Sequence, residues 1–434
     1  MTATRPALTR VAWVTIIAIA VAIAWTHSDV LSAGFRSDDY FAIRPWTMAE
    51  LRAVLTGSWD PLGVQDPYHR PLTALYQSLW HPLFGYDARA MHAVSLIELG
   101  VVAVMLAAFV GRELQRPAAG LLAALMLIVH PMLPDSTTAW IFNQMSLLAD
   151  LTVVGALLVW QRTRTGPARG WWPVWALAAL SFYIKEDGVM LVPALLCIQW
   201  WRARRVGDVP APTPRLVLSG LAVLAVLAAV RVAVFPVAAP WPPSLDSAGY
   251  YLRNLLSGPF HVLVRLPGDS PSAAAGSAAV VLAMLAALVI VWRTRPRTPA
   301  VALLGAGALL MAWFGVPLLL IAGPTRAHLL TLAAALMITA SMAIVYDAVE
   351  PPSARRWLIA GIGATLLALS LASRDINRRY APCSDDSLHS DSLTFDIPSV
   401  APELRAWLRA KPPACAANTY QPLPVDFRVS RPQQ

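Results

Sequence analysis

Long apolar runs constrain this chain more than any other feature of its sequence. A helix that crosses a bilayer needs about 20 predominantly apolar residues. Eleven segments come close to that length. Only 14% of the residues are charged, against about 25% in ordinary soluble domains. The sequence therefore predicts an all-α, polytopic membrane protein with about eleven transmembrane helices. These lie at roughly 9–26, 91–110, 117–133, 145–161, 171–185, 187–201, 215–235, 276–292, 299–322, 327–346 and 356–373.

Basic residues are unevenly distributed between the loops that join these segments. The N-terminal end and alternate loops hold most of them: Arg5, Arg10, Arg112, Arg116, Arg162, Arg164, Arg169, Arg202, Arg204, Arg205, Arg215, Arg293, Arg295, Arg297, Arg355 and Arg356. The short loops on the other side hold Lys185, Arg253, Arg265 and Arg326. Basic residues of short loops stay in the cytoplasm. We therefore expect a cytoplasmic N-terminus and an extracytoplasmic C-terminus, in a bacterial plasma membrane.

The chain divides into a transmembrane domain, 1–373, and a short extracytoplasmic tail, 374–434. The first segment lacks a small-residue cleavage site, so it is interpreted as an anchor and not as a removed signal peptide. The tail contains Cys383 and Cys415. The space outside the membrane is oxidising, which permits a disulfide between them, but the sequence does not show that they meet.

The outer loop 27–90 is long, and long loops in compact proteins are usually functional. Thr47 and Glu50 have the spacing of a helix-capping box. They predict a short helix in the membrane interface, and the apolar stretch 71–84 predicts a second one. Asp38 and Asp39 precede both. Two adjacent carboxylates favour one raised pKa and hence a general base. The alternative is that they cap a helix or pair with Arg36.

Charged residues also gather at later loops on the predicted outer face. Lys185, Glu186 and Asp187 occupy a very tight turn between two segments, and Arg326 follows Gly-Pro-Thr at another. Lysine can neutralise a phosphate as a point charge, and arginine can bind one with two parallel hydrogen bonds. Arg70 has the same capacity. The structural alternatives are an internal Lys185–Glu186 pair, interfacial snorkelling of Arg326, and a pair between Arg70 and Asp66.

Polar residues inside or next to the spans are the remaining candidates. His92 and Glu98 lie within the second segment, where hydrogen-bonded packing is the alternative to a role in a site. Residues 136–144 form a polar strip that includes Trp140 and Asn143 and suits a sugar ring, although an ordinary loop at the headgroup level would look the same. We assign only Glu98 and Arg231 to deep positions within the spans.

Several other classes of protein receive no support. The arginines lie in short clusters between apolar runs, which argues against a nucleic-acid partner. The chain has no phosphate-binding glycine loop, no glycine-rich dinucleotide turn, no His/Cys metal cluster and no internal repeat. A transporter or lipid flippase would place its polar groups near the midplane, often on paired repeats, whereas here the charges gather at one face.

These motifs, taken in order, resemble the GT-C superfamily of membrane glycosyltransferases. The resemblance covers roughly 1–346 and is nearest to the protein O-mannosyltransferase-like group, which includes the transmembrane part of TMTC-type enzymes and their bacterial relatives. The chain departs from the pattern at Ser95, Asn143, Gln144, Ile184 and Thr325. The matching residues are Asp38, Asp39, Tyr68, Arg70, Pro71, Leu72, His92, His130, Pro131, Asp135, Trp140, Ile141, Lys185, Glu186 and Arg326.

The resemblance implies inverting transfer of a sugar from a polyprenyl-phosphate donor to a glycan, lipid or protein acceptor outside the membrane. Asp39 would be the base, and Asp38 is the second candidate for that role. Arg326, Lys185 and Arg70 would hold the donor phosphate. The supporting residues would be Asp135, Glu186, His92, Trp140 and Asn143. In some relatives the matching acids help to hold a metal, so Asp39 and Asp135 would be the ligands of any divalent cation. The alternatives are a transporter or flippase and an inactive scaffold.

Overall fold

The computed structural model describes residues 5–34, 39–43, 45–58, 68–85, 87–130, 133, 138, 140–234, 271–294, 297–320 and 328–380. Within these ranges the ordered elements are helices, and no strand is present. The predicted all-α fold is therefore confirmed. Asp38, Asp135, Arg326, Cys383 and Cys415 lie outside the described residues, as does most of the predicted tail.

Each of the eleven predicted segments corresponds to a helix. Six stretches are long and apolar enough to cross a membrane: Arg10–Ser32, Ala88–Glu113, Ile141–Thr163, Pro214–Val234, Thr331–Ala348 and Pro352–Arg378. The number of crossings stays a prediction, because the remaining helices do not meet this criterion over their described residues. The helices are α1 (Arg5–His27), α6 (Ala88–Glu113), α7 (Pro117–Ile128), α8 (Gln144–Thr163), α9 (Trp172–Ile184), α10 (Leu191–Arg205), α11 (Pro214–Val234), α13 (Pro271–Thr294), α14 (Pro299–Leu320), α15 (His328–Ala348) and α16 (Pro352–Tyr380). α16 thus runs past the predicted boundary at residue 373.

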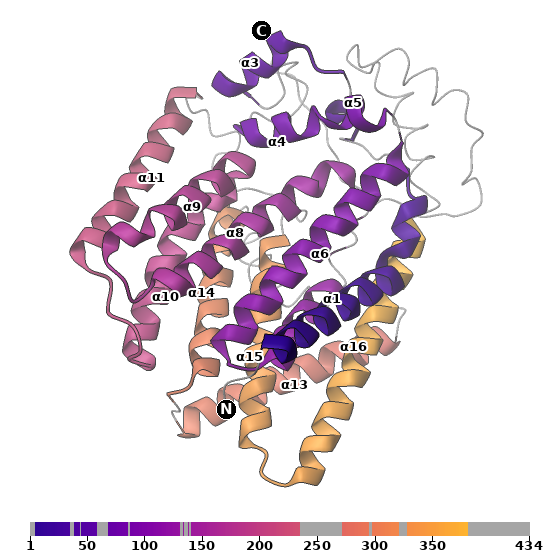
Figure 1. Cartoon of the computed structure of the whole chain (residues 1–434), viewed down its shortest axis with the longest axis vertical. Coiled ribbons are helices and arrows are strands. Elements are labelled where there is room, and N and C mark those ends of the chain that lie inside the picture. Colours follow the sequence, from indigo (N-terminus) through magenta and orange to yellow (C-terminus); the bar gives the residue numbers. More distant parts are fainter. Residues whose placement is uncertain are drawn as a thin grey trace.

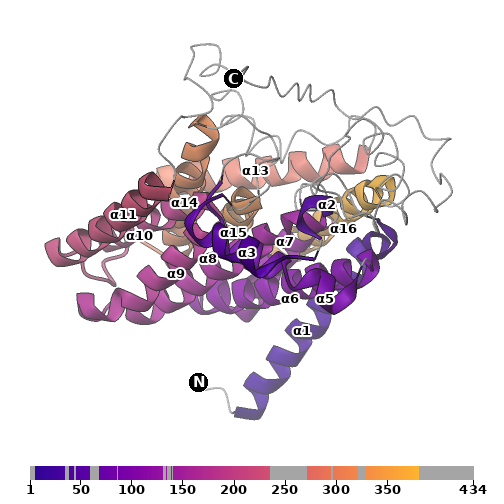
Figure 2. The ribbon, with the colours of Figure 1, turned by 90° about the horizontal axis from the view of Figure 1, so that it is seen from above.

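The loop 27–90, which we predict to be the first outer loop, contains short helices that lie together at one end of the bundle (Figures 1 and 2). They are η1 (Ser28–Ser32), α2 (Asp39–Ala42), α3 (Met48–Thr56), α4 (Pro71–Gln77) and α5 (Trp80–Phe84). The predicted capping box at the start of α3 is confirmed. The Thr47 hydroxyl accepts the Glu50 N–H, and the Glu50 carboxylate accepts the Thr47 N–H. The predicted second interfacial helix forms as two pieces, α4 and α5.

The helix bundle has two ends, and each carries its own set of polar and charged residues. We call the end that holds α2 and α4 the Asp39 end, and the opposite one the Glu113 end. α6 starts at the Asp39 end and finishes at Glu113, and α8 runs the same way. At about 1.5 Å per residue, 20 residues of α8 separate the two ends by roughly 30 Å. The predicted grouping of the arginine-rich loops on one side agrees with contacts of Arg116, Arg164 and Arg202 at the Glu113 end.

Apolar side chains lie both inside and outside this bundle. The core is built from α6, α7, α8, α9, α10, α14 and α15, and it includes Leu106, Leu127 and Leu157, which are fully buried. Large apolar side chains are exposed along α1, α11, α13 and α16, for example Trp13, Leu221 and Leu285. Contiguous apolar surface of this extent is unfavourable in water but fits a lipid environment. The chain is an integral membrane protein.

Candidate active site

Asp39 is the first residue of α2, and its side chain is fully buried. Its Oδ1 accepts the backbone N–H of Phe142 over 2.5 Å. Phe142 belongs to η3 (Ile141–Asn143), the 3-10 turn that leads into α8. A buried carboxylate needs hydrogen bonds to remain charged away from water. The sequence-predicted base is therefore attached to the start of α8, more than one hundred residues away along the chain.

Arg70 immediately precedes α4 and is also buried. Pro71 begins that helix, where its missing N–H costs nothing. The Arg70 guanidinium lies 4.0 Å from the centre of the Tyr68 ring, and Nη1 is 3.6 Å from the sulfur of Met145 on α8. Nη2 is 4.0 Å from the Glu186 carboxylate. Arg70 therefore bridges the first outer loop and the Glu186 turn.

Lys185 closes α9, and its side chain points to the interior. Nζ donates a hydrogen bond of 3.1 Å to the hydroxyl of Ser146 on α8. One turn further along α8, the carboxylate of Asp150 is fully buried and interacts electrostatically with this ammonium group. Neither oxygen of Asp150 has a hydrogen-bond donor. Asp150 is a further ionisable residue within a predicted span, which the assignment of only Glu98 and Arg231 to deep positions omitted. A lone acid in an apolar run was the available signal.

Glu186 contacts His69 and Arg231, whereas the structural alternative in the sequence analysis was a pair with Lys185. Its carboxylate accepts the backbone N–H of His69 over 3.0 Å and lies 3.2 Å from Nε of Arg231 on α11. The predicted Lys185–Glu186 pair is not among these contacts, because Lys185 turns toward α8. Arg231 lies in the last turn of α11 and is partly exposed, and its assignment to a deep position stays a prediction.

The candidate site residues meet at the start of α8 and the 3-10 turn η3 that precedes it. Asp39 contacts Phe142, Arg70 contacts Met145, and Lys185 contacts Ser146. Residues three and four apart share a face of a helix, and Asp150 continues the same row. α8 thus gathers residues from the first outer loop and from the 185–187 turn at one place in the Asp39 end.

Gly188 brings the turn that carries Lys185 and Glu186 close to α9. It lies in η5 (Glu186–Met190), and its N–H donates to the Lys185 carbonyl over 2.8 Å. A Cβ atom built on Gly188 would lie 2.4 Å from the carbonyl carbon and from the hydroxyl of Ser181. Only glycine therefore permits this approach. Thr73 of α4 adds a hydrogen bond of 2.6 Å to the Ile184 carbonyl.

His92 contacts the backbone of two loop segments. Its ring nitrogens lie 3.2 Å from the carbonyl oxygen of Thr138 and 3.4 Å from that of Gly34. Gly34 precedes the segment that leads to Asp39, and Thr138 precedes η3. Because its partners are carbonyl groups in two loops, His92 has the contacts of a positioning residue.

Trp140 and Asn143 flank Phe142 at the start of α8. Asn143 is buried, its N–H donates to the Trp140 carbonyl over 3.0 Å, and its side-chain amide nitrogen has no hydrogen-bond partner.

The Tyr76 hydroxyl of α4 donates to Glu98. Burial and the Glu98 charge raise the pKa of Tyr76 above its ordinary value, so it remains a donor.

No group of three or more His, Cys, Asp or Glu side chains that could hold a metal ion occurs within the described ranges. Of the two acids named for a divalent cation, Asp39 is described and accepts a backbone N–H, while Asp135 lies outside the described residues. The metal assignment therefore stays a prediction.

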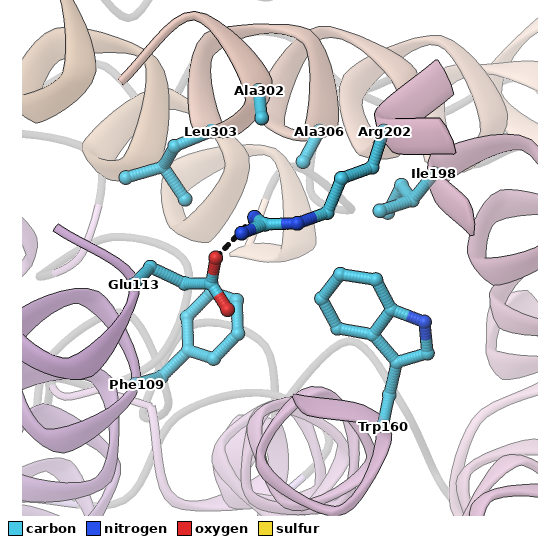
Figure 3. A pocket seen from close by; sticks show the side chains of 8 residues that line it. All are labelled: Phe109, Glu113, Trp160, Ile198, Arg202, Ala302, Leu303 and Ala306. Atoms are coloured by element: carbon cyan, nitrogen blue, oxygen red, sulfur yellow. Dashed lines mark hydrogen bonds and ion pairs between the residues drawn. The ribbon is translucent and has the colours of Figure 1, made fainter. Parts of the chain in front are cut away.

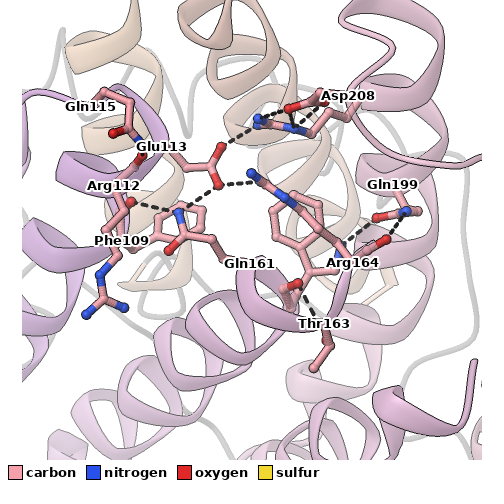
Figure 4. A network of polar contacts seen from close by, with 11 residues as sticks. Phe109, Arg112, Glu113, Gln115, Gln161, Thr163, Arg164, Gln199 and Asp208 are labelled. Atoms are coloured by element: carbon pink, nitrogen blue, oxygen red, sulfur yellow. Dashed lines mark hydrogen bonds and ion pairs between the residues drawn. The ribbon is translucent and has the colours of Figure 1, made fainter. Parts of the chain in front are cut away.

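A small cavity lies at the other end of the bundle, between α6, α10 and α14, where Glu113 and Arg202 face each other (Figure 3). Glu113 is buried, and it also pairs with Arg164 and accepts a hydrogen bond of 2.7 Å from Gln161 (Figure 4). Arg202 pairs further with Asp208. The sequence interpretation did not single out this network, which balances two arginines with two carboxylates and connects the ends of α6, α8 and α10.

Solved structures with a similar fold are oligosaccharyltransferases from Archaeoglobus fulgidus. One is AglB in complex with an inhibitory peptide and a dolichol-phosphate, which superposes with a TM-score of 0.54 at 13% identity. A second, in complex with Zn and sulfate, superposes with a TM-score of 0.53 at 15% identity. The alignments cover 92% of this chain but only 59% and 57% of the archaeal chains. The chain therefore spans less than two thirds of their length.

These superpositions show the fold of the chain. The chain has the GT-C membrane fold. The superfamily resemblance of the sequence is thus confirmed at the level of the fold, and the O-mannosyltransferase-like subtype stays a prediction. No protein-family model matches this chain, and neither does any curated protein.

Proposed function

We propose that this GT-C protein is a membrane glycosyltransferase that transfers a sugar from a polyprenyl-phosphate-linked donor to an acceptor on the extracytoplasmic side. The observation that carries the proposal is the convergence of charged residues at η3 and the start of α8. There a buried carboxylate, Asp39, lies at the same end of the bundle as the cations Arg70 and Lys185. Proton transfer and stabilisation of a leaving phosphate require these two kinds of group together.

In the proposed reaction Asp39 accepts the proton of an acceptor hydroxyl. The acceptor oxygen then forms a bond to the anomeric carbon from the face opposite the phosphate, so the configuration inverts. The bond between that carbon and the phosphate oxygen breaks, and its electron pair remains on the polyprenyl phosphate. Arg70, Lys185 and Arg326 stabilise the negative charge that develops there. Glu186, His92, Trp140, Asn143, Asp38 and Asp135 act as supporting residues.

Transfer by the purified full-length protein in proteoliposomes tests this proposal. A radiolabelled polyprenyl-phosphate sugar and an acceptor extract are supplied, and label bound to the acceptor is measured. A general base contributes about 10² to 10⁴ in rate, so we expect Asp39→Asn to lower transfer by that factor. Asp29→Asn is the matched control, since Asp29 belongs to the same outer loop but pairs with Arg374 and Arg378.

Three outcomes would count against the proposal. Full transfer by Asp39→Asn would remove Asp39 from the base role, with Asp38→Asn then testing the neighbouring carboxylate. Label that crosses the bilayer without joining an acceptor would identify the alternative class, a lipid flippase, and no movement of label at all would favour an inactive scaffold.

A further inference from the structure

Arg231 connects α11 to the candidate site. Its Nε lies 3.2 Å from Oε1 of Glu186, close to the end of the helix. α11 otherwise packs loosely, and its buried residues are Leu216, Gly220 and Leu227. A lipid-facing helix gains little from a charged side chain. The position of Arg231 is therefore best explained by the site that it reaches.

The Glu186 carboxylate lies between two guanidinium groups. Arg231 approaches one oxygen at 3.2 Å, and Arg70 approaches the other at 4.0 Å. The backbone N–H of His69 donates to the carboxylate as well, over 3.0 Å. Two arginines that surround one small anion form the arrangement that binds phosphate with parallel hydrogen bonds. Here the anion is a side chain of the protein itself.

Exposure distinguishes Arg231 from Arg70 and Lys185. The side chain of Arg231 is 32% exposed, whereas that of Arg70 is only 5% exposed. Lys185 is 2% exposed, donates a hydrogen bond to Ser146 and interacts electrostatically with Asp150. Arg231 therefore has the most exposed side chain of these three cations.

We propose that Arg231 is a ligand of the donor phosphate and that Glu186 holds it in place until the donor arrives. The inference rests on the proposed function. A phosphate offers more negative charge than a carboxylate and more acceptor oxygens, so it can displace Glu186 from the guanidinium group. The displaced carboxylate keeps the His69 N–H as a partner, which limits the cost of the exchange.

Binding of polyprenyl phosphate without a sugar tests this exchange. The full-length protein is placed in phosphatidylcholine nanodiscs, and the dissociation constant is measured for three variants. We expect Arg231→Gln to weaken binding about tenfold to a hundredfold, as for loss of a charged hydrogen bond. Glu186→Gln removes the competing anion and should strengthen binding. Arg215→Gln, an exposed arginine at the opposite end of α11, should bind like the unmodified protein.

Unchanged binding by Arg231→Gln would overturn the inference, and so would unchanged or weaker binding by Glu186→Gln. Only variants with an unaltered melting temperature are compared. If Arg231→Gln does not fold, Arg231→Lys replaces it; that variant keeps the charge without the paired donors, and binding several-fold weaker than that of the unmodified protein is then required.

Competition identifies the source of the phosphate. Inorganic phosphate and phosphatidylglycerol should compete at least tenfold less well than polyprenyl phosphate, and equal competition by either would overturn the assignment to the donor. The result also separates the two proposals. Binding that is sensitive to Arg231 without any sugar transfer would contradict the proposed function alone. Transfer with binding that is insensitive to Arg231 would contradict this inference alone.

Discussion

Gly188→Ala tests whether the close packing of the 185–190 turn positions the site. The added Cβ would lie 2.4 Å from Ser181 C and Oγ and 2.6 Å from the Phe182 nitrogen. Ordinary van der Waals contacts begin near 3.4 Å, so the turn or α9 has to move by about 1 Å. Two of the three atoms belong to the backbone, which cannot rotate out of the way.

The expected effects follow from that displacement. Overpacking of a core costs about 1–3 kcal/mol, which thermal unfolding in detergent would detect as a lower melting temperature. A misplacement of about 1 Å can reduce turnover by about 10². Because the Gly188 N–H is bonded to the Lys185 carbonyl, we expect transfer in proteoliposomes to fall by that order even where the protein stays folded.

Gly361→Ala is the matched control. Gly361 lies inside α16, and a Cβ built there meets nothing within 4 Å. Alanine in a helix is favoured over glycine by about 0.5–1 kcal/mol, so this variant should be as stable as the unmodified protein or slightly more so. Equal melting temperatures and equal transfer for Gly188→Ala and Gly361→Ala would refute the reasoning, because the tight approach would then have no consequence.

Three further predictions concern the buried charges and the orientation. Asp150→Asn should lower stability by up to about 3–5 kcal/mol, because the buried Lys185 ammonium group would lose a nearby carboxylate. Lys185→Met in the same chain should recover part of this loss, and equal melting temperatures of the single and double variants would contradict the electrostatic interaction. Glu113→Gln should lower stability by a similar amount but leave transfer per folded molecule unchanged, since about 30 Å separates it from the Asp39 end; a loss of specific transfer would contradict this independence. In a chain without native cysteines, Ala49→Cys in α3 should react with an impermeant maleimide added outside the cell, whereas Ala118→Cys in α7 should not; the reverse pattern would invert the topology.

Much of the architecture was predictable because it depends on local sequence. The apolar runs correspond to helices in all eleven predicted segments, since a helix satisfies its own backbone hydrogen bonds in lipid. The capping box at Thr47 is likewise a local signal, and it formed as predicted. Asp39, Arg70 and Lys185 were identified as candidate site residues. A charged side chain beside an apolar segment has a high free-energy cost, so few purely structural roles explain it.

The partners of those residues were not predictable. Nothing near Lys185 in the sequence indicates that it turns to Ser146 and Asp150, or that Glu186 holds Arg231 instead. These contacts join residues that are about 35 to 45 positions apart, and the contact of Asp39 with Phe142 joins residues more than one hundred apart. Such contacts depend on how α8, α9 and α11 pack together. The amino-acid sequence alone therefore determined which segments are helical and which charges need an explanation. Only the tertiary structure decided which charge meets which, because helix formation depends on near neighbours whereas side-chain pairing depends on the packing of distant helices.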